Sequence, residues 1–284
     1  MGKKFFKSAF LIIISILIIS CKTLPPKNLK KTFLSEIEGL QWQKVSEDFS
    51  VIDMRNTKNA KTFLDFFSVE NTSKKNPSFF LVKLNLENPA LKINIFPDEK
   101  KEFYDALNVK KIAKKNSSKI AFNTTPFQVQ NKLNLNSKGK PVGIIYANKQ
   151  TICEPVEKYS ALIFFKEENG YSAQIIKNQK EIPKNIDSAA GGFFQILDDC
   201  KTISYKEIFD TRTSIGISSD KKILFILAGK NLSYDNCAKI LKICGAETAM
   251  EFDGGSSTHL VIQGKSIVKK SFHRNVPALI TFDF

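Results

Sequence analysis

Residues 222–258, KILFILAGKNLSYDNCAKILKICGAETAMEFDGGSST, carry the clearest structural signal in the sequence. Residues 222–228 are mostly apolar and predict a buried strand, and residues 229–231 predict a turn after it. Ser233 can cap a helix whose apolar residues recur at i, i+3, i+4 and i+7, and Gly245 ends it. We therefore expect a strand, a turn and an amphipathic helix in this order.

A second strand fits residues 248–253, so the unit reads β-α-β, with parallel strands and a right-handed crossover. The two-residue period of a strand places Glu251 and Asp253 on one face. Two glycines and three hydroxyl side chains follow as residues 254–258. Glycines let the backbone approach a ligand, and ligands favour the carboxyl ends of such strands. A carboxylate beside N–H and O–H donors indicates a sugar or phosphate site; the alternative is a tight turn with a solvated aspartate.

The remaining chain reads as short strands with few helices. Asn108 can cap a short helix that runs to Lys115. The polar residues 130–140 predict a loop, which is a candidate lid. Strand-like runs lie at residues 49–54, 79–86, 91–96, 120–123, 142–146, 161–165 and 213–217. This pattern predicts an α+β fold, in which a mixed β-sheet with a few helices includes the C-terminal β-α-β unit.

The N-terminus has the features of an export signal. Residues 1–20 begin with lysines and continue as an almost unbroken apolar stretch, too short for a comfortable membrane span. Residues 18–21, Ile-Ile-Ser-Cys, resemble a bacterial lipobox, which predicts lipidation of Cys21; an uncleaved anchor is the alternative. Residues 21–36 then form a tether and residues 37–284 the folded domain. We expect an exported, membrane-anchored lipoprotein in the periplasm or at the cell surface.

The chain is strongly basic, with 43 basic and 28 acidic residues and a formal net charge of +15. A basic exported protein favours anionic partners such as phosphate-bearing glycans or lipid headgroups. The lysines are scattered and no stacking motif accompanies them, which argues against nucleic acid. The alternative is a general bias toward Lys, Asn, Ile and Phe that carries no information about partners. Arginine stands only at Arg55, Arg212 and Arg274, which hints that these positions need a planar, bidentate donor.

The cysteines predict little covalent cross-linking. Cys237 and Cys244 lie seven residues apart on the apolar face of the predicted helix, where small buried hydrophobic residues are expected. An exported protein can also form disulfides, and here the candidate pair is Cys153 with Cys200. The spacing of the cysteines does not match a zinc site.

Five motifs, taken in chain order, resemble one family. They are residues 121–127 (AFNTTPF), 190–193 (AGGF), 211–217 (TRTSIGI), 245–257 (GAETAMEFDGGSS) and 273–277 (HRNVP). They are similar to a strand ending in Asn-Gly-Gly-Phe-Phe, a small-residue loop, Arg-Thr-Ala-Ile-Gly, Leu-Asp-Gly-Gly-Gly-Ser-Ser and a closing Arg-Pro-Val. This set and order resemble the phosphodiester glycosidases, the family of uncovering-enzyme-like domains. The resemblance covers the chain from about residue 79 to the C-terminus.

The resemblance implies an enzyme that hydrolyses a sugar 1-phosphodiester and releases a sugar and a phosphomonoester. Three departures stand against it. Thr124 and Thr125 replace two glycines, Ser256 replaces a third glycine, and Glu251 stands where asparagine is common. The alternative function is therefore a catalytically inactive glycan- or polymer-binding lipoprotein that keeps the fold.

Glycosyl transfer to water needs a base or nucleophile at the anomeric carbon and an acid or cation at the departing oxygen. We expect Asp253 to be catalytic, with Glu251 as a second carboxylate about 6.5–7 Å away along the strand. Arg212 is the candidate phosphate ligand, and a structural ion pair is its alternative. The other candidates for substrate or phosphate contact are Asn123, Gly191, Gly192, Thr213, Gly254, Gly255, Ser256, Ser257, His259 and Arg274. Asp253 and Asn123 offer too few oxygen ligands to define a metal site, so a divalent metal and any other cofactor stay open.

Overall fold

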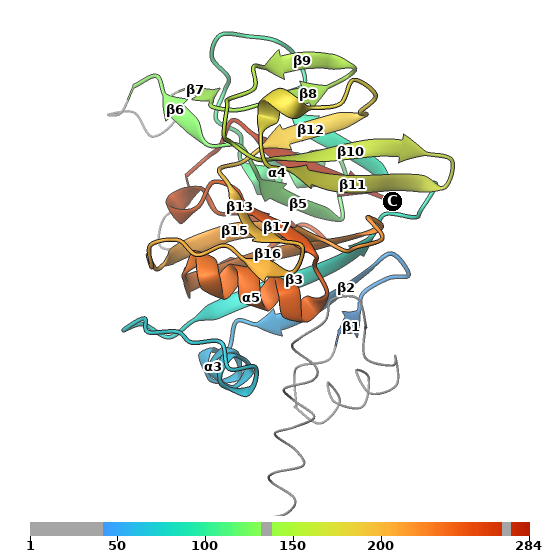
Figure 1. Cartoon of the computed structure of the whole chain (residues 1–284). Helices are drawn as coiled ribbons and strands as arrows, with labels where there is room; N and C mark the ends of the chain where they lie inside the picture. Colours follow the sequence, from blue (N-terminus) through green and yellow to red (C-terminus); the bar gives the residue numbers. More distant parts are fainter. Residues whose placement is uncertain (1–41, 132–137, 269–273) are drawn as a thin grey trace, which may run out of the picture. The chain divides into compact units, whose positions relative to one another are not determined.

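The computed structural model describes residues 42–131, 138–268 and 274–284 (Figure 1). The predicted signal peptide, the lipidation site Cys21 and the tether lie outside these residues and stay predictions, as does the middle of the loop at 130–140. Within the described ranges, no helix is both long and apolar enough to cross a membrane. The fold is α+β as predicted, with three α-helices among the described residues. The predicted mixed sheet is wrong, because neighbouring strands in the described ranges all pair antiparallel.

The largest layer is an antiparallel eight-stranded sheet in the order β1-β2-β3-β16-β15-β17-β13-β14. Its strands are β1 (Gln43–Lys44), β2 (Phe49–Met54), β3 (Ser78–Asn85), β13 (Gln195–Asp198), β14 (Lys201–Thr202), β15 (Asp210–Ile217), β16 (Ile223–Leu232) and β17 (Thr248–Glu251). The central strands β3, β15 and β16 have buried side chains on both faces rather than an alternating pattern. Both faces of this sheet are therefore covered, one by helix α5 and one by the other sheets (Figure 1).

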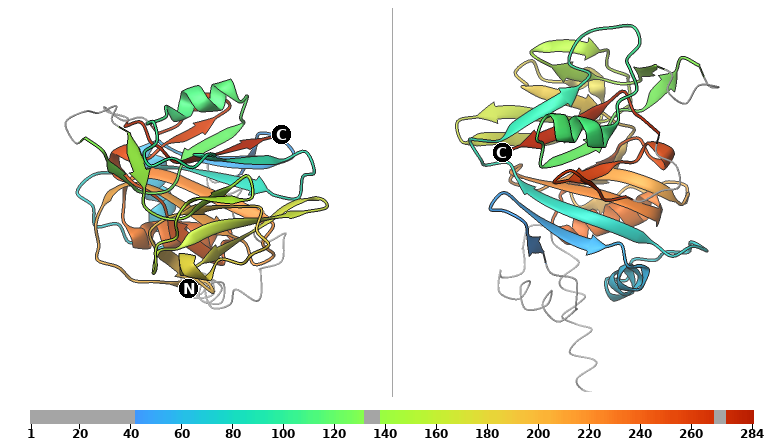
Figure 2. Two further views of the ribbon diagram at one scale, coloured as in Figure 1. Left: turned by 90° about the horizontal axis from the view of Figure 1, so that it is seen from above. Right: turned by 180° about the vertical axis from the view of Figure 1, so that it is seen from behind.

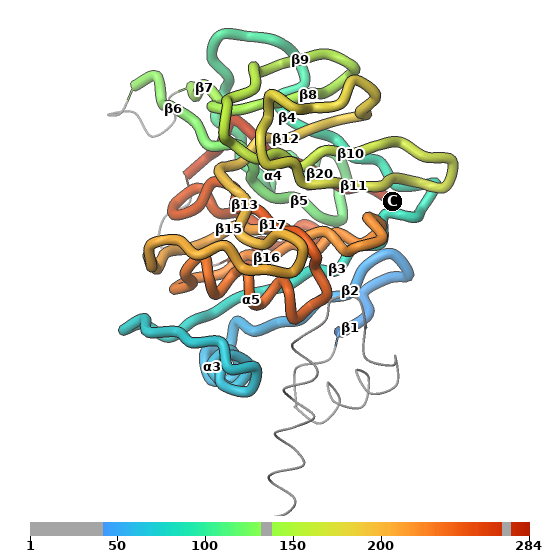
Figure 3. The backbone as a smooth tube through the Cα atoms, viewed as in Figure 1, coloured from blue at the N-terminus to red at the C-terminus, as the bar shows by residue number. Residues whose placement is uncertain are grey.

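Helix α5 (Tyr234–Cys244) connects β16 to β17 and packs on β13, β15, β16 and β17 (Figure 3). Its predicted ends are confirmed. The hydroxyl of Ser233 accepts a hydrogen bond from the Asn236 amide, and Gly245 ends the helix with φ of 108°. Strands β16 and β17 both pair antiparallel with β15, which lies between them, so they run in the same direction.

Two local predictions fail where sheet pairing overrides the local signal, and one helix was missed. The turn predicted at 229–231 is wrong, because β16 continues to Leu232 and a bulge with Asn231 at φ 55° takes up the irregularity. Strand β17 ends at Glu251 instead of reaching Asp253. Helix α3 (Thr57–Phe66), with Asn56 as its N-cap, was not expected.

Two five-stranded antiparallel sheets complete the sandwich. The second sheet, in the order β11-β10-β12-β8-β9, consists of β8 (Ile145–Ala147), β9 (Gln150–Cys153), β10 (Ala161–Glu167), β11 (Gly170–Ile176) and β12 (Ser188–Gly191). The third sheet, in the order β19-β18-β5-β20-β4, consists of β4 (Lys92–Phe96), β5 (Ile120–Asn123), β18 (Leu260–Ile262), β19 (Lys265–Ser266) and β20 (Leu279–Asp283). Helix α4 (Val109–Lys115), capped by Asn108 as predicted, packs on β5 and β18 at the back of the molecule (Figure 2).

The smaller elements lie outside these sheets. They are the two-stranded β6 (Phe127–Val129) and β7 (Gly139–Pro141) and the 3₁₀ turns η1 (Gln179–Glu181) and η2 (Gly255–Ser257). Cys237 is buried as expected, and Cys244 is half-buried. The proposed Cys153–Cys200 disulfide is wrong, because the Cys153 thiol is free and lies beside the Tyr104 hydroxyl.

Aromatic rings hold the three sheets together in one core. Phe122 of β5 stacks on Phe282 of β20 with ring centroids 6.0 Å apart, and Phe282 meets Phe164 of the second sheet at 6.2 Å. Phe122 also contacts Phe252, just beyond β17, at 6.0 Å. Each of these rings is fully buried. The segment that carries Asp253 is therefore anchored in the core by the residue before it.

We expect Phe122→Ala to lower the free energy of unfolding by about 3–5 kcal/mol, because it removes a buried ring that packs on Phe282 and on Phe252 and leaves a cavity. Phe66→Ala is the matched control, since Phe66 is 37% exposed, and it should change stability by less than about 0.5 kcal/mol. Urea unfolding of both variants measures the difference. Equal effects would contradict this description of the core.

Candidate active site

One buried amide joins the segments that form the candidate site. The Asn123 side chain donates from Nδ2 to the Asp253 carbonyl at 2.6 Å. Its Oδ1 accepts from the Thr213 hydroxyl at 2.9 Å and from the His259 amide at 2.8 Å. Asn123 is 1% exposed. It therefore fixes the end of β5 in the third sheet to β15 in the eight-stranded sheet and to the loop after β17.

Asp253 lies just beyond the end of β17 and is half-buried. Its amide donates to the Thr124 carbonyl at 2.9 Å, and its own carbonyl is held by Asn123. Both backbone polar groups are thus fixed by the end of β5. The backbone of Asp253 is therefore fixed at the junction of two sheets, and a positioned catalytic group requires such a fixed backbone.

The loop after Asp253 folds into the tight turn η2. A Cβ atom on Gly254 would lie 2.9 Å from the Thr211 carbonyl, and Gly255 has φ of 59°, so both positions need glycine. The amides of Ser257 and Thr258 close the turn onto Gly254 and Gly255. The amides of Gly254 and Ser256 donate to no acceptor in the described part of the chain. Two N–H groups in one tight turn, two residues apart, can donate to an anion.

A buried charged pair lies beneath this turn, on the side of the sheet that faces α5. Arg212 Nη1 lies 3.9 Å from Glu251 Oε1, and the Ser214 hydroxyl donates to Glu251 Oε2 at 2.5 Å. Glu251 Oε1 is buried and accepts no hydrogen bond from the described residues. A Cβ on Gly254 would lie 3.9 Å from Arg212 Nη1 and 4.0 Å from Glu251 Oε1, so both groups approach the turn from below.

Burial raises the pKa of Glu251 to about 8. Arg212 and the Ser214 hydrogen bond act in the opposite direction, while the charges of Asp253 and Asp210 raise the pKa further. Because burial has the largest effect, the side chain is mainly protonated at neutral pH. The positive charge of Arg212 is then not cancelled by its neighbour.

Arg212 itself is 5% exposed, and its guanidinium already donates two hydrogen bonds within the protein. Its Nη2 donates to the Ile208 carbonyl at 2.5 Å and its Nε to the Leu232 carbonyl at 3.3 Å. The guanidinium lies 3.8 Å from the ring centroid of Tyr234 at the start of α5. These contacts support a structural role for Arg212, with bonds to carbonyls and a ring beside a mainly neutral Glu251, and direct phosphate contact stays a prediction.

Of the other predicted site residues, several gather at the site, whereas Gly191 and Gly192 do not. Thr213 and His259 bond Asn123, and His259 Nε2 lies 2.8 Å from the Arg274 carbonyl, so these residues gather at the site. The Arg274 guanidinium stacks on the Phe127 ring at 4.3 Å, and its amide donates to the Ser256 carbonyl. Ser256 is exposed on the turn, whereas Ser257 is buried.

Gly191 and Gly192 serve packing in this structure. Their amides already donate to the carbonyls of Ile144 and Ser160. A Cβ on Gly191 would lie 2.5 Å from the Gln179 side chain, and one on Gly192 would lie 2.4 Å from Met250. Close packing within the chain thus explains why both positions are glycine. Their amides are already bonded and are not available to phosphate.

Several residues of the site were not expected from the sequence. Ser214 shares a strand face with Arg212, two residues before it, and this spacing is a signal that could have identified it. Tyr234 is brought to Arg212 by the helix cap, which no local pattern reveals. The hydroxyls of Thr124 and Thr125 are buried beside Asn123 with no hydrogen-bond partner among the described residues. In the same ranges, no group of three His, Cys, Asp or Glu side chains is arranged to hold a metal.

Residues 116–282, more than half of the chain, match the family model described as phosphodiester glycosidase. The chain belongs to the phosphodiester glycosidase family. This confirms the family that the five motifs indicated. No curated protein matches the chain.

Solved structures share the fold. The catalytic domain of zebrafish N-acetylglucosamine-1-phosphodiester α-N-acetylglucosaminidase, auto-inhibited by its pro-peptide, has a TM-score of 0.58 at 12% identity, covering 85% of this chain and 86% of that one. A protein from Burkholderia pseudomallei has a TM-score of 0.58 at 8% identity, with 80% of each chain covered. A hypothetical protein from Synechocystis has a TM-score of 0.53 at 13% identity; the match covers 84% of this chain but 62% of that one.

The raised pKa of Glu251 predicts a pH-dependent stability. The folded chain holds a proton on Glu251 up to about pH 8, whereas the unfolded chain loses it at about 4.5. The stabilising contribution is therefore complete below about pH 4.5 and is lost as the pH rises to about 8, by at most about 5 kcal/mol. In Glu251→Gln this contribution is absent.

Urea unfolding at about pH 5 and about pH 9 measures the effect as the difference between the native protein and Glu251→Gln. The native protein should lose more stability than the variant over this range. Glu47→Gln, which changes an exposed glutamate, is the control and should follow the native protein. Parallel pH profiles for the native protein and Glu251→Gln would show that Glu251 is ionised throughout.

Proposed function

We propose that this chain is an exported hydrolase that cleaves a sugar 1-phosphodiester of an envelope or extracellular glycan and is anchored to a membrane through Cys21. Membership of the phosphodiester glycosidase family supports the reaction class. The observation that carries the proposal is the fixed position of Asp253, whose backbone is held by Asn123 and Thr124 above a buried carboxyl–guanidinium pair.

The phosphate would lie against the turn that follows Asp253. The amides of Gly254 and Ser256 can donate to its oxygens, and Arg274 adds a positive charge beside the turn. The positive charge of Arg212 attracts the phosphate electrostatically from beneath the turn. A neutral Glu251 does not cancel this charge, and burial keeps it poorly screened by water. This arrangement favours an anion without requiring Arg212 to touch it.

Asp253 would act at the anomeric carbon of the bound sugar. As a base it takes a proton from water, whose oxygen bonds to the anomeric carbon while the bond from that carbon to the phosphate oxygen breaks. The oxygen of the broken bond stays on phosphorus, so the products are a free sugar and a phosphomonoester. As a nucleophile it would first form a glycosyl ester that water then hydrolyses, with the same products.

An inactive glycan-binding lipoprotein is the alternative, and one observation favours it. Thr124 and Thr125 stand beside Asn123 where the family resemblance has glycines, and their buried side chains occupy space next to the site. The enzyme function is favoured by the fixed backbone of Asp253, which Asn123 and Thr124 hold at the end of β5.

We expect Asp253→Asn to lower turnover by at least about 10³-fold while leaving the melting temperature almost unchanged, because the backbone bonds of Asp253 remain. Turnover is measured as free sugar and phosphomonoester released from a panel of sugar 1-phosphodiesters, with and without divalent metal. Asp65→Asn, an exposed change on α3, is the matched control and should keep full activity. A folded native protein that releases nothing from the panel would support the binding function, and full activity in Asp253→Asn would exclude Asp253 as the catalytic group.

A further inference from the structure

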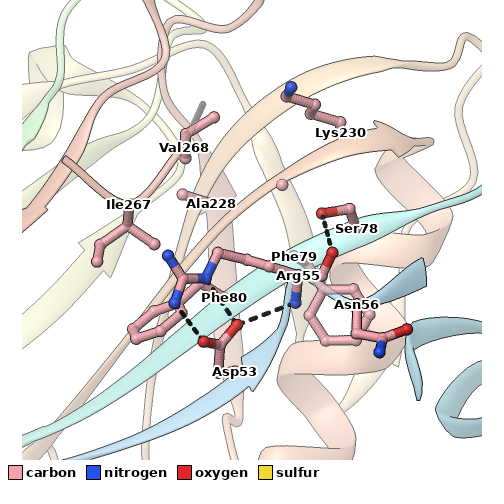
Figure 4. Close-up of a pocket in the computed structure, with 11 residues that line it drawn as sticks. Asp53, Arg55, Asn56, Ser78, Phe79, Phe80, Ala228, Lys230, Ile267 and Val268 are labelled. Atoms are coloured by element: carbon pink, nitrogen blue, oxygen red, sulfur yellow. Dashed lines mark hydrogen bonds and ion pairs between the residues drawn. The ribbon is translucent and has the colours of Figure 1, made fainter. Parts of the chain in front are cut away.

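A pocket of about 470 Å³ opens between the eight-stranded sheet and the segment that follows β19 (Figure 4). This volume lies within the range of about 300–1,000 Å³ that is typical of small-ligand sites. Strands β2, β3 and β16 form its floor, and Ile267 and Val268 form an apolar wall. The pocket contains Arg55, the one arginine that the candidate active site does not use.

The polar side of the pocket is built around Arg55 and Asp53. Arg55 Nε donates to Asp53 Oδ1 at 2.7 Å, and Nη2 donates to Oδ2, while the guanidinium lies 5.4 Å from the Phe80 ring centroid. Burial opposes ionisation of Asp53, but the hydrogen bonds and charge of Arg55 together lower its pKa. The two charges therefore cancel, and Arg55 Nη1 remains without a protein acceptor in the described part of the chain.

Lys230 adds a positive charge to this neutral pair. It belongs to the end of β16 and lines the pocket opposite the hydrogen-bonded Arg55–Asp53 pair (Figure 4). Within the described ranges its ammonium group forms no ion pair. The pocket thus has a net positive charge, two N–H donor groups and an apolar wall. An anionic group attached to a carbon skeleton suits this combination.

Two connections place the pocket next to the candidate active site. Thr213, which bonds Asn123, pairs with Ala228, Ala228 pairs with Phe80, and Phe80 pairs with Asp53. These three strand spacings correspond to about 14 Å. On the third sheet, the Ile267 amide donates to the carbonyl of Leu260, the residue after His259.

We propose that this pocket binds a second phosphate group of the same substrate, one repeat along a phosphate-linked glycan whose terminal sugar 1-phosphodiester is cleaved at Asp253. The proposal rests on the proposed function and narrows the substrate class to a polymer with repeated phosphates. Arg55 and Lys230 hold the second phosphate, and the apolar wall contacts the carbon skeleton beside it. A substrate with a single phosphodiester fills only the site at Asp253.

The first test uses inorganic phosphate as the probe and the full-length protein. Amide resonances of Ser78, Gly229 and Lys230 should shift on titration, and Lys230→Gln should weaken this binding about fivefold. Lys110→Gln, which removes an exposed lysine on α4, is the matched control and should change nothing. Absence of a response at these three amides, or an equal response in Lys230→Gln, would overturn the anion site.

The second test compares two ligands in the full-length Asp253→Asn protein, which separates binding from turnover. The ligands are a methyl phosphodiester of N-acetylglucosamine 1-phosphate and its two-repeat oligomer. The oligomer should bind about tenfold more tightly, and Lys230→Gln should remove about fivefold of this advantage without weakening the single-repeat ligand. Arg55→Gln should act in the same direction and provides a second variant.

Equal affinity for the two ligands, or an equal loss for both in Lys230→Gln, would overturn the second-phosphate site, as would an absence of binding by either. The proposed function is tested separately from this binding experiment, by measuring release of sugar by the native protein. A protein that binds the oligomer through Lys230 but hydrolyses nothing would support the second-phosphate pocket and contradict the proposed enzymatic activity.

Discussion

The buried amide of Asn123 is the interaction on which the rest of the site depends. It bonds the hydroxyl of Thr213 on β15 and, in the loop after β17, the carbonyl of Asp253 and the amide of His259. Each bond contributes about 1 kcal/mol net, but loss of the amide would leave three buried polar groups unpaired, at about 1–3 kcal/mol each. The fixed position of Asp253 therefore follows from a structural bond between two sheets.

Electrostatics gives the site its preference for anions. Burial keeps Glu251 mainly neutral at neutral pH, so the charge of Arg212 acts on the turn above it. The amides of Gly254 and Ser256 lie in the same tight turn and have no acceptor in the described part of the chain, and the chain as a whole carries a net charge of +15. These electrostatic contributions all attract an anion, and they are strongest where water is excluded. An anionic substrate is thus favoured both in approach and in binding.

Much of the fold was predictable because its signals are local. The caps at Asn108 and Ser233 and the glycine at the end of α5 depend on neighbouring residues, and the structure has them as expected. The end of β17 before Asp253 and the bulge near Asn231 were not predictable, because sheet pairing decides them. For the site, the motif identified the region of Asp253, but the strand period alone does not say which face of β17 is buried, so the burial of Glu251 was not predicted.

The central claim is that Asp253 directs attack at the anomeric carbon of a sugar 1-phosphodiester. Turnover in isotopically labelled water tests it most directly, because sugar and phosphomonoester are the products of cleavage on either side of the bridging oxygen. The account predicts that the label enters the released sugar and none enters the phosphate. Label in the phosphomonoester would show attack at phosphorus and would contradict a glycosidase mechanism at Asp253.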